Sequence, residues 1–240
     1  MKIAVAQTKP VTGDIQRNIG RHGILIDLAV AKGADTIIFP ELSLTGYEPA
    51  LAKALAIDPE DNRLDELQQL SNTRQITIGA GAPTRHAAGI RISMILFQPG
   101  KQRQLYSKKY LHADEEPFFI SGPDATGLIG ENSDIALAIC YEISVPQHAE
   151  EAFKNGAGIY VASVAKVASG MEKAWHRLAE IGKDYAMPVL MANAIGPADG
   201  AICAGGTSVW NDKGQLIQQL DDSREGILIL DTDTQEVVAH

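Results

Sequence analysis

The sequence has few cysteines, no long apolar run and no secretion signal. Its only cysteines in 240 residues are Cys140 and Cys203, so we do not expect the disulfide framework of a small secreted protein. No apolar run approaches the roughly 20 residues that span a bilayer, and residues 1–7 lack the basic and apolar regions of a signal peptide. We therefore expect a cytoplasmic protein without a membrane partner, in which each thiol needs its own explanation.

Clusters of basic residues and cofactor-binding motifs are missing as well. Acidic residues outnumber basic residues by 30 to 21, which gives a net charge of −9, and no stretch gathers five or six basic residues, so a nucleic acid would be repelled. The six histidines show no zinc-ligand spacing, and neither a GxGxxG nor a GxxxxGKS/T motif occurs. We expect no cofactor, no metal and no nucleic-acid partner.

Predicted strands and helices alternate along the chain, which indicates an α/β fold. The runs at 92–98 and 102–107 flank the turn Pro99-Gly100 and predict an antiparallel hairpin, so the sheets should be mixed. With 45% hydrophobic residues among 240, the chain can bury the core of a single domain spanning residues 1–240. Other strands are predicted at 2–7, 36–39, 76–80, 135–140, 159–163, 189–193, 207–210, 215–218 and 226–230, and helices at 15–32, 64–72, 147–155 and 172–185.

Three of the predicted strands lead to a reactive side chain. Glu41 comes after the apolar run 36–39, Lys108 follows the strand 102–107, and Cys140 closes the strand 135–140. Loops at strand ends are where α/β folds place reactive groups. Taken one at a time, each residue also has an ordinary interpretation: a solvated carboxylate, a lysine that protects a sheet edge, and a small buried hydrophobe.

Longer motifs surround these three residues and cover nearly the whole chain. They are residues 13–15 (GDI), Asn18, 33–35 (GAD), 39–47 (FPELSLTGY), 106–108 (YSK) with Leu111, Glu115 and Gly122, 139–142 (ICYE) with Pro146, and Asn193 with 206–208 (GTS). In kind and order, they resemble the nitrilase-like carbon–nitrogen hydrolase superfamily. That resemblance implies a four-layer α-β-β-α sandwich with two mixed β-sheets, commonly assembled as a homodimer or a larger homo-oligomer.

The resemblance also assigns catalytic roles. Cys140 is expected to be the nucleophile, Glu41 the general base, Lys108 the oxyanion stabiliser together with the Tyr141 amide, and Glu115 a second glutamate that orients the leaving amine or Lys108. The chemistry needs these residue types, because a thiol with a pKa near 8.5 is only a few per cent thiolate at neutral pH and requires a base during attack. The oxyanion that forms then requires a positive donor in a dry pocket.

Two positions in the lysine segment have a neighbour of the same type. Lys109 follows Lys108, and Glu116 follows Glu115. Spacing to Tyr106 and to Gly122 favours Lys108 and Glu115, although Glu116 stays open as the second glutamate. A strand points consecutive side chains to opposite faces, so only one lysine of the pair can enter the site.

The residue after the nucleophile bears on the substrate. It is Tyr141, where nitrile hydrolysers of this superfamily usually have tryptophan, so the resemblance implies an amidase acting on a small linear amide. Tyr47, Tyr141, Glu142 and Ser163 are candidate substrate-binding residues, with ordinary packing as the alternative. N-carbamoyl and nitrile substrates remain open, as does a non-catalytic binding or scaffold member, and the role of Cys203 is not decided beyond a structural expectation.

Overall fold

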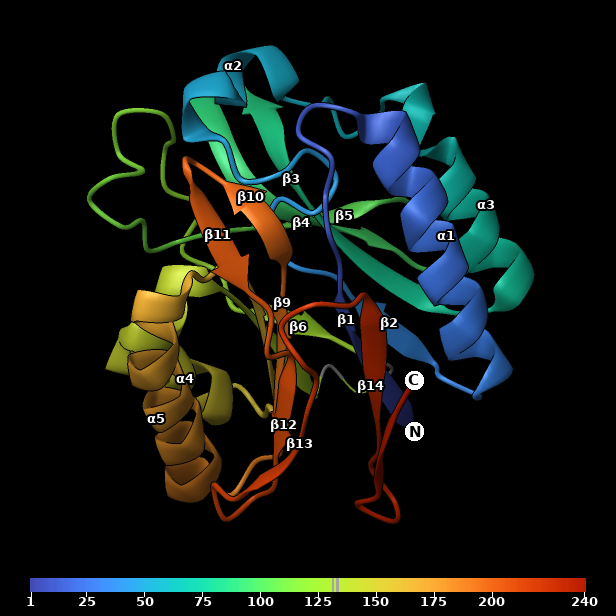
Figure 1. Cartoon of the computed structure of the whole chain (residues 1–240), viewed down its shortest axis with the longest axis vertical. Helices are drawn as coiled ribbons and strands as arrows, with labels where there is room; N and C mark the ends of the chain where they lie inside the picture. The colour runs from blue at the N-terminus through green and yellow to red at the C-terminus, as the bar shows by residue number, and fades with distance from the viewer. Residues whose placement is uncertain (131, 133) are drawn as a thin grey trace.

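The structure is a computed structural model that describes residues 1–130, 132 and 134–240, and within these residues its strands form two mixed sheets (Figure 1). The first sheet has the order β15-β14-β1-β2-β3-β4-β5. Its central pairs β1/β2 and β2/β3 are parallel, and the others are antiparallel. The bounds are β1 (Lys2–Gln7), β2 (Thr36–Ile38), β3 (Thr77–His86), β4 (Gly89–Phe97), β5 (Gln104–Ser107), β14 (Gly226–Asp231) and β15 (Val237–Ala239).

The second sheet has the order β13-β12-β9-β8-β7-β6. Its three inner strands β7, β8 and β9 are parallel. A separate hairpin of β10 (Ile195–Ala198) and β11 (Ala201–Ala204) follows β9. The bounds in the sheet are β6 (Gly127–Ile129), β7 (Ile135–Ile139), β8 (Ile159–Val164), β9 (Val189–Asn193), β12 (Ser208–Trp210) and β13 (Leu216–Gln219).

Alternating side chains divide the interior into layers. In β1, Ala4 and Ala6 pack with the helices α1 (Ile15–Ala31) and α3 (Asp65–Arg74), whereas Ile3 and Val5 pack between the two sheets. The outer face of the second sheet packs against α4 (Pro146–Lys154) and α5 (Ala168–Tyr185). Figure 1 shows α1 and α3 on one side and α4 and α5 on the other, with the strands between them. The expected four-layer α-β-β-α sandwich is confirmed.

Local signals explain where the first helix begins and ends. The Asp14 side chain caps α1 by accepting a hydrogen bond from the Arg17 N–H at 3.1 Å. Gly33, just beyond the helix, has a φ of +79°, which is the left-handed conformation that ends many helices. No helix in the described part of the chain is long and apolar enough to cross a membrane.

Some elements differ from the sequence prediction. β3 continues to His86 and pairs with β4 along its whole length, whereas the sequence predicted a strand that ended at residue 80. The strands β6, β10, β11 and β15 were not predicted. The segment between Glu41 and α3 contains the short helical turns η1 (Pro49–Leu51) and η2 (Asn62–Leu64) and the short helix α2 (Ala52–Leu55), which were not predicted either. These are short elements or glycine- and proline-containing segments whose pairing depends on tertiary contacts.

Candidate active site

The ends of β2 and β5 bring three charged side chains into contact. Lys108 Nζ donates to Glu41 Oε1 at 2.8 Å and to Glu115 Oε1 at 2.6 Å. All three side chains are buried. Pro40 and Glu41 follow β2, while Lys108 follows β5 directly and Glu115 lies in the next turn. The structure thus joins residues that are 67 positions apart in the chain.

The charges in this cluster depend on one another. Burial raises the pKa of Glu41 above its ordinary 4.5, and the charge of Lys108 opposes that effect. Burial alone would lower the pKa of Lys108, but the charges of Glu41 and Glu115 raise it well above its ordinary value. Lys108 therefore remains an ammonium group, because two carboxylates compensate for its loss of hydration.

Cys140 lies at the end of β7, beside this cluster. It begins the short helix η3 (Cys140–Ser144) with a φ of +45°, a left-handed conformation that costs a non-glycine residue about 1–3 kcal/mol. Burial raises the pKa of the Cys140 thiol to about 11, with a further contribution from Glu41. Cys140 is therefore a thiol at neutral pH and needs a base to become a nucleophile.

Glu41 has a free acceptor for the thiol proton. Its Oε1 binds Lys108, whereas its Oε2 is buried without a hydrogen-bond partner in the described part of the chain. The Cys140 thiol is close enough to favour the carboxylate form of Glu41. A buried carboxylate oxygen left unpaired is costly unless it serves a function.

Three donors hold Glu115 in place. Besides Lys108, the Tyr47 hydroxyl donates to its Oε1 at 3.0 Å, and the His112 N–H donates to its Oε2 at 2.8 Å. Burial raises the pKa of Tyr47, so its hydroxyl remains a donor. Both oxygens of Glu115 accept hydrogen bonds, and the side chain is buried. These features suit a carboxylate that orients Lys108 rather than one that exchanges protons.

Lys109 and Glu116, the neighbours of Lys108 and Glu115, point away from the charged cluster. Lys109 Nζ pairs with Asp124 at 2.5 Å and Glu151 at 3.0 Å, and its side chain is 17% exposed. Glu116 is exposed. The cluster therefore contains Lys108 and Glu115, as the spacing to Tyr106 and Gly122 favoured.

The model of the carbon-nitrogen hydrolase family matches residues 2–239. This chain belongs to that family. This chain is 25% identical over 225 residues to an (R)-stereoselective amidase of Pseudomonas sp. The match covers 90% of this chain and 80% of the amidase. The chain is also 25% identical to a glutamine-dependent NAD(+) synthetase of Thermotoga maritima over 98% of this chain, but spans only 42% of the synthetase.

Solved structures of other proteins share the fold of this chain. An amidase from Nesterenkonia sp. superposes with a TM-score of 0.86 at 23% identity, covering 95% of this chain and 89% of the amidase. This similarity confirms the arrangement of the sheets and helices. The resemblance to the nitrilase-like superfamily that the motifs indicated is also confirmed.

Glu142 and Ser163, two of the four candidate substrate-binding residues, form hydrogen bonds within the protein next to the site. Glu142 is buried and accepts hydrogen bonds from the Tyr106 hydroxyl at 2.6 Å, the Lys109 N–H at 2.6 Å and the Ile139 N–H at 2.7 Å. The buried Ser163 hydroxyl donates to the Phe39 carbonyl at 2.8 Å. Because these polar atoms are already bonded within the protein, we assign both residues to support rather than to the pocket lining.

The other two candidates lie on the accessible side. Tyr47 is partly buried, with its hydroxyl on Glu115. Tyr141 is 36% exposed, and its ring makes an edge contact with His112 at 5.2 Å between centroids. Their contact with a substrate stays a prediction.

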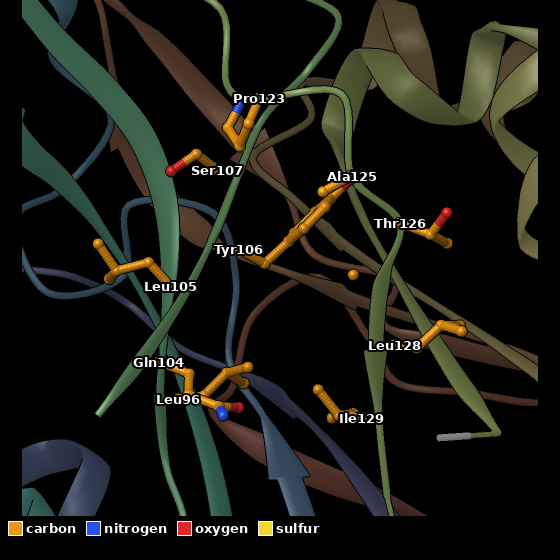
Figure 2. Close-up of a pocket in the computed structure, with 11 residues that line it drawn as sticks. Leu96, Gln104, Leu105, Tyr106, Ser107, Pro123, Ala125, Thr126, Leu128 and Ile129 are labelled. Atoms are coloured by element: carbon orange, nitrogen blue, oxygen red, sulfur yellow. The ribbon is translucent and has the colours of Figure 1, made fainter. Parts of the chain in front are cut away.

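A separate cavity of about 350 Å³ lies between the edge strands β5 and β6. Figure 2 shows Tyr106 among the residues that line it, together with Leu105 and Ala125. Its lining does not include Glu41, Lys108, Glu115 or Cys140. The candidate active site is therefore defined by the charged cluster and not by this cavity.

In residues 1–130, 132 and 134–240, no group of three or more histidine, cysteine, aspartate or glutamate side chains is placed to hold a metal ion.

The sequence did not indicate several residues of the site. The His112 N–H, which holds Glu115, and the buried pair His148 and Tyr160 behind Glu142 belong to no motif. Lys166 was also missed, although its charge lowers the pKa of Cys140. Backbone donors and single lysines leave no sequence signal, so only the folded arrangement reveals them.

Proposed function

We propose that this chain hydrolyses the C–N bond of a small linear amide, giving a carboxylate and ammonia. The observation that carries the proposal is the free Oε2 of Glu41 beside the Cys140 thiol, with the other oxygen of Glu41 held by Lys108. Nucleophile, base and buried cation are the three groups that acyl transfer from an amide requires.

The first half of the reaction forms a thioester. Glu41 Oε2 takes the thiol proton while the sulfur of Cys140 attacks the amide carbon. Lys108 and the backbone N–H of Tyr141 stabilise the negative charge that develops on the carbonyl oxygen, and one such donor contributes about 3 kcal/mol. Glu41 then returns the proton to the nitrogen, the C–N bond breaks, and ammonia leaves.

The second half releases the acid. Glu41 takes a proton from water, the resulting hydroxide attacks the thioester carbon, and the C–S bond breaks as the proton returns to sulfur. Glu115 keeps Lys108 in position through both halves. One water is consumed for each ammonia and each carboxylic acid released.

Ammonia release from small amides, N-carbamoyl compounds and nitriles tests this proposal. We expect release from the amides, and a loss of at least about 100-fold in Cys140→Ala and in Glu41→Gln, because each variant removes a group that takes part in bond formation. The matched control is Cys203→Ala, which removes the other, buried thiol. Release from nitriles or N-carbamoyl compounds alone would move the assignment to those substrates. If no compound of the panel released ammonia and Cys140 did not react with iodoacetamide, the result would favour a non-catalytic member of the family.

A further inference from the structure

A chain of four buried polar side chains leads from α4 toward the site. His148, on α4, has its Nε2 2.8 Å from the Tyr106 hydroxyl and its Nδ1 2.8 Å from the Tyr160 hydroxyl. The Tyr106 hydroxyl donates to Glu142 Oε2 at 2.6 Å. All four side chains are buried. They belong to β5, η3, α4 and β8, so the chain links the edge of the first sheet to the second sheet and its outer helix.

The protons of this chain can be placed, because Glu142 is surrounded by donors. The Lys109 N–H donates to its Oε1 at 2.6 Å, and the Ile139 N–H donates to its Oε2 at 2.7 Å. A phenol has a single proton, so the Tyr106 hydroxyl must point that proton at the carboxylate. Burial raises the pKa of Tyr106, so the phenol keeps its proton. The Tyr106 oxygen is left as an acceptor for His148.

One tautomer of His148 satisfies both of its ring nitrogens. Its Nε2 carries the proton and donates to the Tyr106 oxygen, since Glu142 Oε2 lies farther away, at 3.5 Å. Its Nδ1 accepts from the Tyr160 hydroxyl, whose pKa burial also raises. Burial lowers the pKa of His148 below its ordinary 6.5, although the charges of Glu142 and Glu151 oppose this effect. The ring is therefore neutral at neutral pH, with its proton on Nε2.

The orientation of the Tyr106 hydroxyl bears on the reacting groups. Glu142 accepts from the residue after Lys108 and from the residue before Cys140. If Nε2 of His148 lacked a proton, the Tyr106 hydroxyl could turn to it instead, and Glu142 would lose a donor. A proton on Nε2 removes this alternative acceptor and keeps the hydroxyl on the carboxylate.

We propose that His148 is a positioning residue of the amide hydrolysis, whose Nε2–H keeps the Tyr106 hydroxyl on Glu142. Through Glu142, it fixes the separation of Lys108 and Cys140. The inference rests on the proposed function and adds to it a residue that acts through other side chains. Because displacing reacting groups by about 1 Å can cost about 100-fold in rate, a small shift of Glu142 is enough to lower kcat.

Glutamine and asparagine in place of His148 separate the roles of the two ring nitrogens. The amide nitrogen of glutamine reaches the position of Nε2, so His148→Gln can still donate to Tyr106. Asparagine is one carbon shorter and reaches only the position of Nδ1, so His148→Asn keeps a partner for Tyr160 and loses the donor to Tyr106. We expect kcat to fall by about tenfold or more in His148→Asn and by less than about threefold in His148→Gln, with little change in KM.

Two measurements test the inference. Steady-state kinetics of ammonia release on the best amide of the panel, with thermal melts to verify folding, gives kcat and KM for each variant. His176→Asn is the control, because His176 is exposed on α5. Long-range ¹H–¹⁵N correlation spectra, recorded without substrate, show which ring nitrogen of His148 carries the proton, and we expect Nε2.

The possible results distinguish this inference from the proposed function. Equal kcat in folded His148→Gln and His148→Asn, whether lowered or unchanged, would overturn the inference, because the Nε2 donor would then make no difference. A proton on Nδ1, or on both nitrogens at neutral pH, would also overturn it. If the wild type released no ammonia from any amide while His148 carried its proton on Nε2, the proposed function would fail and the hydrogen-bonded chain would stand.

Discussion

At the scale of single residues, the site is a balance of buried charges. Lys108 lies between Glu41 and Glu115, with contacts of 2.8 and 2.6 Å. In the proposed reaction, proton transfer from Cys140 to Glu41 leaves the total charge of the cluster unchanged, since one carboxylate is neutralised as one thiolate forms. The low-polarity site therefore does not have to accommodate additional charge during attack.

The two adjacent lysines provide a matched pair of variants. Lys108→Met should lower kcat at least about 100-fold, because it removes the buried donor to the developing oxyanion. Lys109→Met should change kcat by less than about threefold, because a solvent-screened ion pair contributes about 1 kcal/mol or less. Steady-state kinetics on the best amide of the panel, with thermal melts to verify folding, measures both. Equal losses in two folded variants would contradict the position of Lys108 in the site.

The raised pKa values predict the pH dependence. Glu41 must be a carboxylate to act as the base, and its pKa lies above 4.5, so kcat/KM should increase with pH through a value higher than that of an ordinary glutamate. The Cys140 pKa of about 11 keeps the nucleophile a thiol, so kcat/KM should then stay level to pH 10. A pH–rate profile of the free enzyme measures both features. A second inflection near pH 8.5, typical of an unperturbed thiol, would contradict this assignment.

At the scale of elements, one carboxylate connects the two strand ends that carry Lys108 and Cys140. Glu142 accepts from the N–H of Lys109, the residue after Lys108, and from the N–H of Ile139, the residue before Cys140. The Tyr106 hydroxyl donates to the same carboxylate and lies 2.8 Å from His148. Glu142 therefore sets the distance between the first sheet and the nucleophile.

Glu142→Gln should weaken this connection. The amide has one acceptor oxygen and places its NH₂ group against a backbone donor, which leaves a buried N–H unsatisfied at a cost of about 1–3 kcal/mol. We expect kcat to fall by about tenfold or more while KM changes little, if Glu142 positions the reacting groups as its hydrogen bonds within the protein indicate. Glu150→Gln, on the exposed face of α4, is the control. A lower melting temperature with unchanged kcat would show that Glu142 serves stability alone.

The strands that bear the site were predictable, but parts of their surroundings were not. β7 and β9 follow plain apolar runs and were predicted within one residue. The second half of β3 was missed because Gly81 and Pro83 are typical of turns. In the structure, a Cβ at position 81 would lie 2.6 Å from the Pro40 carbonyl oxygen and 2.4 Å from the Leu42 nitrogen. Gly81 is thus required by the close approach of the Glu41 loop, a contact that the local pattern does not contain.

At the scale of the whole molecule, the site exists only where the two sheets meet. Motif order placed Glu41, Lys108 and Cys140 at strand ends, but the sequence contains no distances, and Lys166 lies in no motif. The sheets are joined near the site by a bridge between Thr8 and Ala194 and by the hydrogen bond from Ser163 to Phe39. Such links between segments distant in the chain arise from packing alone.

Gln7 forms another of these links and supports a prediction on stability. Its buried side chain accepts from the Thr207 N–H at 3.1 Å and donates to the carbonyls of Asp221 at 2.7 Å and Arg224 at 2.8 Å. Gln7→Met keeps the length of the side chain but removes its polar atoms, so buried backbone groups lose their partners. We expect the free energy of unfolding to fall by about 2–4 kcal/mol.

Urea denaturation followed by circular dichroism measures this loss. Gln69→Met is the matched control, because Gln69 is exposed on α3 and surface substitutions usually change stability by about 0.5 kcal/mol or less. If the two variants unfolded at the same urea concentration, Gln7 would contribute little to joining the sheets. If only Gln7→Met unfolded earlier, with an unchanged slope, the hydrogen bonds across the two sheets would be part of what holds the site together.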